Sequence, residues 1–442
     1  MLPEWFLPRA PDYNLRIPLV TTLLERPTMT SFPWRRMFAA AALAFTFVVT
    51  APAADDFFFK DGDRVMFLGD SITEQYHYSS EIEAYLTTRF PKWRLQFLNA
   101  GISGDTATGG AGRFKTHVLD EKPTALTINF GMNDGGYGKF DKNRCDQFIA
   151  NTEKMLDAAK AASVRVALCS PNAVDRRYKS NGAEYLETQK EFYAPLAASA
   201  AKFAIPFADQ YAKTRTELEK MEADKADNVK PFPDGFHTAP SGGLMMAHAI
   251  LTQLKAPALV SDVSIDISSG KVSEQACKVS GLAADPSALE FARLDEALPL
   301  PLQADWTTVL PYLNNLKDLN WYGLKVTGLT AGKYAVSIDG VEVTQHTADE
   351  LTAGVNLGNV TKGPIYDQAK NVRDAINAKN TQVHQRFRGV VMFNAPDWLA
   401  DVAVERKVAE LQKRLEKIAA AQASIYEAVQ PVKHQFAIKA VK

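Results

Sequence analysis

The 442-residue chain has few of the residues and patterns that mark metal proteins or nucleic-acid-binding proteins. Its three cysteines (Cys145, Cys169 and Cys277) lie far apart without a CxxC pair, so we expect at most one disulfide and no thiolate metal site. The seven histidines are scattered without metal-ligand spacing. A net charge of −1 gives no electrostatic basis for binding nucleic acid or an anionic membrane surface.

The common enzyme motifs are missing as well. The sequence contains no HExxH zinc motif, no P-loop, no GxGxxG dinucleotide motif and no GxSxG nucleophile elbow. No internal repeat or low-complexity tract stands out. These absences disfavour metal-dependent hydrolysis and nucleotide-dependent chemistry.

The N-terminal segment has the layout of an export signal. An arginine pair precedes an apolar run over 37–49, and small residues at Ala51 and Ala53 precede an acidic start. This pattern predicts a secretory signal peptide cleaved after Ala53 or Ala54, and the run is too short for a permanent membrane span. We therefore expect residues 1–54 to be an extension and signal peptide of a secreted or periplasmic protein, with no stable membrane insertion after cleavage. A membrane anchor, a later start codon and a twin-arginine route stay open.

Residues 55–257 alternate short apolar runs with helical patterns. The expected strands are 64–69, 95–101, 125–131, 164–171 and 205–209. The expected helices are 79–90, 143–162, 184–203 and 210–224. Apolar strands that are each followed by a helix indicate a parallel sheet covered on both faces, and such sheets bind ligands at the carboxyl ends of their strands.

The pattern changes after residue 257. Residues 258–362 read as a small β-rich domain, in which Asp339-Gly340 between two alternating runs predicts a type I′ hairpin. Residues 363–442 read as a helical region. There a coiled-coil-like seam, broken only at Gln422, comprises Val404, Val408, Leu411, Leu415, Ile418, Ile425 and Val429. Packing of this helix on the rest of the chain is favoured over an oligomerisation helix, which stays open, and a structural role of the β-rich domain is favoured over glycan binding.

Polar residues gather in the loops that follow the expected strands. Ser71 follows Gly69-Asp70 directly after the first strand, where its hydroxyl and N–H would face the carboxyl edge of the sheet. Taken alone, a serine at such a turn is more often a helix cap. In "NAGISGDT", Gly101 and Gly104 follow the second strand, and a glycine offers an unobstructed N–H, although a plain turn is the simpler interpretation.

Two later loops carry an amide and an acid–base pair. "GMNDGG" places Asn133 after the third strand, where its amide can donate to a developing oxyanion, and Asp134 is expected to hydrogen-bond backbone. "FPDGFHTAPSGG" sets Asp234 three residues before His237, so the carboxylate can orient the imidazole while its other nitrogen takes a proton. Taken alone, His237 would be read as a surface residue, and His248 is expected to be packed.

Together the four segments supply what a serine nucleophile needs, and they resemble the sequence blocks of the SGNH (GDSL-like) hydrolase superfamily. The later segments resemble the C-terminal extension of its secreted bacterial members. The resemblance implies that Ser71 is the nucleophile, His237 the general base and Asp234 its partner. It also implies an oxyanion hole formed by the N–H of Ser71, the N–H of Gly104 and the side chain of Asn133, with no cofactor and no metal.

The resemblance covers less than half of the chain and implies a flavodoxin-like three-layer α/β sandwich. We expect a secreted serine esterase that hydrolyses short-chain acyl esters, with O-acetyl groups on carbohydrate as one candidate substrate. Its expected partners are small-molecule or glycan esters, and an oligomer formed through the C-terminal helix stays open. A lysophospholipase or thioesterase-type hydrolase is the enzymatic alternative. A non-catalytic glycan-binding protein on a vestigial hydrolase fold is the alternative from another class.

Overall fold

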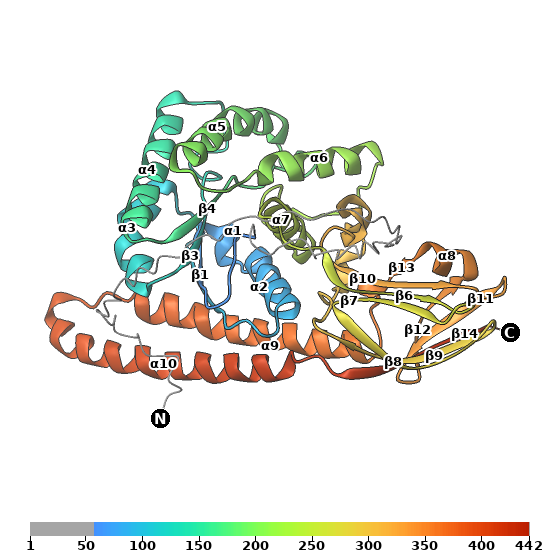
Figure 1. The fold of residues 1–442 in the computed structure, drawn as a ribbon. Helices are drawn as coiled ribbons and strands as arrows, with labels where there is room; N and C mark the ends of the chain where they lie inside the picture. The colour runs from blue at the N-terminus through green and yellow to red at the C-terminus, as the bar shows by residue number, and fades with distance from the viewer. Residues whose placement is uncertain (1–56, 442) are drawn as a thin grey trace, which may run out of the picture. The chain divides into compact units, whose positions relative to one another are not determined.

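The computed structural model describes residues 57–441 (Figure 1). The signal peptide predicted within residues 1–54 lies outside the described residues. Among the described helices, none combines the length and the apolar character that a membrane span requires. The three cysteines are free and buried.

A five-stranded parallel sheet, in the order β2-β1-β3-β4-β5, carries the loops of interest. Its strands are β1 (Arg64–Gly69), β2 (Gln96–Gly101), β3 (Ala125–Asn129), β4 (Arg165–Cys169) and β5 (Phe207–Ala208). The strand interiors are apolar and buried because helices cover both faces of the sheet. The five strands expected from the sequence are therefore confirmed, most with shorter bounds.

Helices flank this sheet on two sides. Figure 1 shows α3 and α4 on one side and α2 and α7 on the other, while α5 packs against α4 and α6 against α7. The helices are α1 (Ser71–Glu74), α2 (His77–Arg89), α3 (Ala107–His117), α4 (Lys142–Ala161), α5 (Gly182–Phe203), α6 (Gln210–Ala223) and α7 (Pro240–Gln253). This arrangement confirms the three-layer α/β fold.

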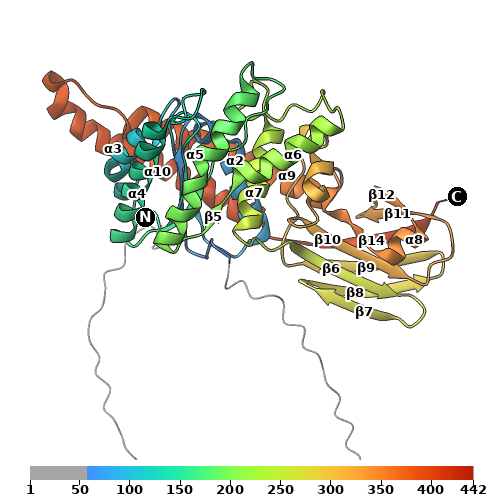
Figure 2. The same cartoon turned by 90° about the horizontal axis from the view of Figure 1, so that it is seen from above.

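The β-rich region forms two further sheets, with strand orders β13-β10-β6-β7 and β12-β11-β14-β9-β8. Figure 2 shows most of these strands lying together, apart from α3 and α4. The strands are β6 (Leu259–Asp266), β7 (Lys271–Gln275), β8 (Cys277–Asp285), β9 (Ala288–Asp295), β10 (Trp321–Thr327), β11 (Lys333–Ile338), β12 (Val341–Thr347), β13 (Val355–Asn356) and β14 (Lys433–Ala440). Short helices η4 (Ala304–Trp306), η5 (Leu310–Leu316), α8 (Ala348–Ala353) and η6 (Leu357–Asn359) connect them. Asp339 and Gly340 have φ values of 48° and 80° between antiparallel β11 and β12, which confirms the predicted hairpin turn.

The helical C-terminal region consists mainly of α9 (Pro364–Arg386) and α10 (Ala400–Ala428), which pack against each other. It does not remain helical to its end. The chain continues into β14, which pairs with β11 and β9 and so joins the second sheet of the β-rich region. This strand was not predicted from the sequence.

The predicted seam on α10 is covered increasingly toward its C-terminal end, and its middle residues Leu411, Leu415 and Ile418 are half-buried. Ile425 and Val429 are fully buried, whereas Val404 and Val408 are 65% and 63% exposed. The polar seam residue Gln422 is buried and accepts a 3.1 Å hydrogen bond from Nζ of a buried lysine on α9. Packing of α10 on the chain is confirmed for its C-terminal part, and oligomerisation through the exposed part stays a prediction.

Buried polar contacts tie α9 and α10 to the sheet domain. Lys379 of α9 forms an ion pair with Glu83 of α2, and each side chain is 1% exposed. Asn380 donates to Glu83 Oε2 at 3.0 Å. The hydroxyl of Tyr426 on α10 donates to the carbonyl of Leu95, next to the edge strand β2. The helix pair therefore lies over the edge of the sheet, where an uncovered strand would invite association with other chains.

Candidate active site

Ser71 is the first residue of α1 and is separated from the end of β1 by Asp70 alone. The helix cap is Asp70, whose Oδ1 accepts the N–H of Ile72 at 3.0 Å. The alternative that Ser71 is the cap is therefore wrong, because the preceding residue already fills that role. The sharp turn also requires Gly69, since a Cβ there would lie 2.2 Å from Oγ1 of Thr73.

The structure brings Ser71, His237 and Asp234 into one hydrogen-bonded chain. Ser71 Oγ lies 2.9 Å from His237 Nε2, and His237 Nδ1 lies 2.7 Å from Asp234 Oδ2. The carboxylate favours the tautomer with the proton on Nδ1, so that Nε2 is free to accept the serine proton. The His237 side chain is 32% exposed, which leaves this arrangement accessible from solvent.

The carboxylate of Asp234 is held by its own loop, between α6 and α7. Its Oδ1 accepts the backbone N–H groups of Phe236 and His237 at 3.1 and 2.8 Å. Partial burial raises the pKa of Asp234, but the hydrogen bonds from His237 and Phe236 outweigh burial and hold that pKa below its ordinary value. Asp234 is therefore a carboxylate at neutral pH and can stabilise an imidazolium.

A neighbouring loop, between β4 and α5, fixes the position of the Asp234–His237 loop. The N–H of Asp175 donates to the carbonyl of Gly235 at 2.7 Å, and Nδ2 of Asn172 donates to the carbonyl of Phe236 at 3.2 Å. Asn172 and Asp175 are completely buried. Neither residue was predicted from the sequence. Their position just after the fourth expected strand is the signal that could have suggested them.

Two further predicted residues lie in the loops after β2 and β3. Gly104 is exposed and has a φ of +76°, a left-handed conformation that side chains disfavour. Asn133 donates from Nδ2 to the carbonyl of Asp105 at 2.9 Å, and its Oδ1 accepts the hydroxyl of Tyr137 at 2.9 Å. An amide nitrogen carries two hydrogens, so one N–H of Asn133 remains to donate to a ligand. Tyr137 was not predicted from the sequence.

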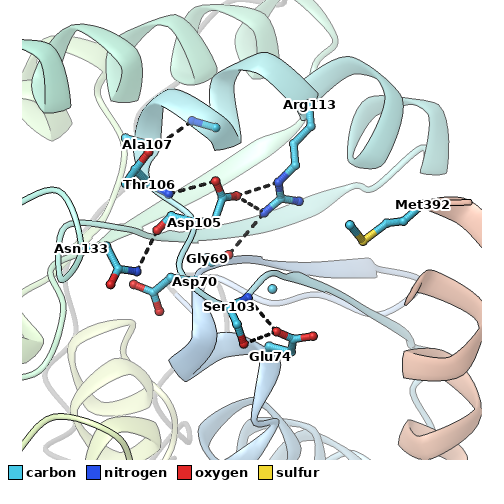
Figure 3. A network of polar contacts seen from close by, with 12 residues as sticks. Gly69, Asp70, Glu74, Ser103, Asp105, Thr106, Ala107, Arg113, Asn133 and Met392 are labelled. Carbon is cyan, nitrogen blue, oxygen red and sulfur yellow. Dashed lines mark hydrogen bonds and ion pairs between the residues drawn. The ribbon is translucent and has the colours of Figure 1, made fainter. Parts of the chain in front are cut away.

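An ion pair next to these loops fixes the start of α3. Arg113 Nε donates to Asp105 Oδ2 at 2.8 Å, and Nη2 reaches the carbonyl of Gly69 at 3.3 Å. Figure 3 shows this network between Asn133 on one side and Arg113 on the other. The contact to Gly69 links α3 to the turn that carries the serine.

Two buried carboxyl groups in this network have raised pKa values. Burial, with a smaller contribution from neighbouring carboxylates, raises the pKa of Asp70 to about 7. Burial also raises the pKa of Asp134 to about 7, although its Oδ1 accepts the N–H of Ala107 at 3.0 Å. Asp134 therefore hydrogen-bonds backbone, as expected.

Within residues 57–441 no group of three or more histidine, cysteine or acidic side chains is arranged to hold a metal ion.

Comparison with known proteins identifies the family of this domain. Residues 67–242 match the GDSL-like Lipase/Acylhydrolase family. This domain belongs to the SGNH (GDSL-like) hydrolases. Thioesterase 1/protease 1/lysophospholipase L1 of Escherichia coli K12 is 30% identical over 137 residues, which are 30% of this chain and 65% of that protein. Esterase TesA of Pseudomonas aeruginosa is 32% identical over 114 residues, 25% of this chain and 51% of that protein. The chain thus spans less than two thirds of either relative.

A solved structure matches this SGNH hydrolase well beyond the sheet domain. A gut microbial diltiazem-metabolizing enzyme is 25% identical, with a TM-score of 0.76, and the match covers 87% of this chain and 98% of that chain. The family match ends at residue 242, so the structural match extends over most of the β-rich and helical C-terminal regions. The whole described fold, and not the sheet domain alone, therefore has a counterpart.

Proposed function

We propose that this SGNH hydrolase cleaves acyl esters through a covalent acyl-enzyme on Ser71. The observation that carries the proposal is the hydrogen-bonded chain from Ser71 Oγ through His237 to Asp234. Ser71 Oγ attacks the ester carbonyl carbon while His237 Nε2 takes its proton, and Asp234 stabilises the resulting imidazolium. His237 then gives the proton to the leaving alcohol.

The negative charge that develops on the carbonyl oxygen needs fixed donors. The N–H of Ser71 has no partner inside α1, because the first amides of a helix lack one. We assign this N–H, the N–H of Gly104 and the remaining amide N–H of Asn133 to the oxyanion hole. Each such donor contributes about 3 kcal/mol to transition-state stabilisation. Water then attacks the acyl-enzyme, with His237 again acting as base.

The favoured substrate is a short-chain acyl ester, with O-acetyl groups on carbohydrate as the leading class. No sustained apolar lid flanks the catalytic loops in the sequence. We also propose export of the protein, supported by the apolar run at 37–49 and the small residues after it. N-terminal sequencing of the exported protein should then find Ala54 or Asp55 as the first residue.

Replacement of the nucleophile tests the reaction. Ser71→Ala should lose turnover of p-nitrophenyl acetate by at least about 10⁴-fold and should no longer be labelled by a fluorophosphonate. Its thermal unfolding should remain close to that of the parent protein. Retained turnover in a folded Ser71→Ala protein would disprove the assignment. A folded parent protein that neither hydrolyses esters nor takes the label would instead support a vestigial, glycan-binding protein.

The enzymatic alternative is a lysophospholipase or thioesterase, two activities that appear in the name of the Escherichia coli relative. The preferred acyl-chain length separates the proposal from this alternative. A series of p-nitrophenyl esters from acetate to palmitate should show falling kcat/KM beyond about four carbons. Highest activity on the longest chains, or on lysophospholipid or acyl thioesters, would favour a lysophospholipase or thioesterase.

A further inference from the structure

A cavity of about 290 Å³ lies between the start of α2, the start of α7, the middle of α9 and the segment before η4. Apart from Pro240, every residue that lines it carries a polar side-chain group. Gln75, Asn377 and Thr381 form an exposed rim, while Ser80 and Glu81 are buried in the wall. This volume is close to the lower end of the ~300–1,000 Å³ range of ligand pockets.

The cavity adjoins the catalytic loops. Gln75 follows α1, and its N–H donates to the carbonyl of Ser71 at 3.0 Å. Thr238, directly after His237, donates from Oγ1 to Oε1 of Gln75 at 3.1 Å, and its carbonyl lies 2.8 Å from His77 Nδ1. Because α1 contains four residues, the cavity wall begins about 6 Å along the helix from the serine. A substrate held by Ser71 can therefore extend into this cavity.

The buried wall contains polar atoms that no described residue satisfies. Glu81 is 5% exposed, and its Oε1 accepts a 2.6 Å hydrogen bond from Nε2 of Gln303. Its other carboxyl oxygen, Oε2, is buried and has no hydrogen-bond partner within the described chain. The buried hydroxyl of Tyr76 also lacks one there. Unsatisfied buried polar groups are rare because each costs about 1–3 kcal/mol, so a ligand that supplies partners would bind favourably.

The polar residues that line the cavity favour some classes of ligand over others. Amides, hydroxyls and a carboxyl group offer both donors and acceptors, which matches hydroxyl groups that also donate and accept. No lysine or arginine lines the cavity to pair with a phosphate or carboxylate. An alkyl chain would leave the polar atoms without partners. A cation is disfavoured because the guanidinium of Arg373 already acts on Glu81 and lowers its pKa, although burial raises that pKa more strongly, to about 8.

We infer that this cavity binds a neutral saccharide that forms the alcohol part of the ester, an assignment that rests on the proposed function of Ser71. The helix α9 supplies Asn377 and Thr381 to the rim, and Figure 1 shows α9 running past α2. The C-terminal helical region thereby completes the substrate site of the sheet domain. The acyl group remains at Ser71, and the sugar occupies the cavity.

The experiment compares one ester that has a sugar with one that does not. Asn377→Leu removes an exposed rim amide, so the protein should fold normally. Its kcat/KM ratio for acetylated xylotriose over p-nitrophenyl acetate should fall about 10-fold, mainly through KM for the saccharide ester, as expected for one lost hydrogen bond. Asn371→Leu is the matched control, because Asn371 is exposed on the same helix but does not line the cavity. It should leave both activities unchanged.

A binding measurement tests saccharide binding in the cavity independently of ester hydrolysis. Titration calorimetry of the Ser71→Ala protein with acetylated xylotriose should give a Kd that Asn377→Leu weakens about 10-fold and Asn371→Leu does not. An unchanged ratio and Kd in Asn377→Leu would overturn the inference, as would a parent enzyme that cleaves p-nitrophenyl acetate but no saccharide ester. In both cases the proposed function would stand. Preference for acetylcholine over the saccharide ester would also overturn the inference in favour of a cationic alcohol. Loss of activity on every ester, with no labelling of Ser71, would instead refute the proposed function.

Discussion

The hydroxyl of Tyr137 donates a 2.9 Å hydrogen bond to Oδ1 of Asn133 and thereby decides which end of that amide faces the catalytic loops. Burial raises the pKa of Tyr137, so its phenol keeps its proton and acts as a donor at neutral pH. With Oδ1 occupied, Nδ2 of Asn133 donates to the carbonyl of Asp105, and its second N–H remains for the substrate oxyanion.

Removal of this hydroxyl should weaken catalysis without weakening substrate binding. Tyr137→Phe is expected to lower kcat on p-nitrophenyl acetate about 10-fold and leave KM nearly unchanged, because the amide loses its fixed orientation. Asn133→Ala should lower kcat about 10²–10³-fold through loss of the donor itself. In the Asn133→Ala background, Tyr137→Phe should have no further effect. Additive losses in the double variant would contradict a positioning role for Tyr137.

Catalysis should also be sensitive to a change in the backbone conformation at Gly104. No atom lies within 4 Å of a Cβ built there, so the φ of +76° alone opposes a side chain. Gly104→Ala should cost about 1–2 kcal/mol of strain, and relaxation of the loop would turn the N–H away from the oxyanion. We expect kcat to fall about 10–100-fold, and Gly104→Asn to retain more activity because asparagine tolerates this conformation. Equal kcat in the Ala variant and the parent would argue against the N–H of Gly104 as a donor.

Sequence patterns predicted the elements that have a strong local signal and missed those whose formation depends on distant contacts. The glycine-rich helix α3 was not predicted, since glycine disfavours helix, yet Gly110 is needed where a Cβ would lie 2.5 Å from Phe130. Strand β14 was also missed. Its alternating buried residues His434, Phe436 and Ile438 were visible in the sequence, but its partners β9 and β11 lie about 100 or more residues earlier.

The same difference between local sequence signals and distant contacts applies to the candidate site. Ser71, Asp234 and His237 could be proposed because each lies in a recognisable loop, and the structure brings all three together. Asn172 follows the fourth expected strand, but its role arises from a contact with the carbonyl of Phe236 in a loop far along the chain. Tyr137 lies four residues after Asn133 in the same loop, and the sequence does not show that its hydroxyl turns back to that amide.

The buried carboxyl of Asp70 should make stability depend on pH. Its pKa rises from about 3.8 to about 7 on folding, mainly through burial, so the folded state favours the protonated form. That contribution is complete below pH 3.8 and is lost as pH rises through 7. Asp70→Asn keeps an acceptor for the cap and removes the charge. Relative to the parent, this variant should gain stability between pH 5 and 8, by at most about 4 kcal/mol.

Thermal unfolding at pH 5, 6, 7 and 8 checks this prediction. The difference in Tm between Asp70→Asn and the parent should grow steadily in favour of the variant as pH rises. Asp157→Asn, at an exposed position on α4, is the control and should show no such trend. A constant difference for Asp70→Asn across this range would mean that Asp70 does not titrate there.

Removal of only one partner of the ion pair between Lys379 and Glu83 should lower the free energy of unfolding more than removal of both. Both side chains are 1% exposed, and Lys379 Nζ also donates to Gln422 Oε1 at 3.1 Å. Burial raises the pKa of Glu83, and the lysine opposes this rise. Lys379→Met should therefore destabilise the fold by about 3–5 kcal/mol, because it leaves a buried acid without its cation. The double variant Lys379→Met/Glu83→Gln should recover much of this loss, since neither charge is then buried. Urea unfolding of the four proteins in this cycle measures the coupling, and additive effects would show that α9 is held to α2 by packing alone.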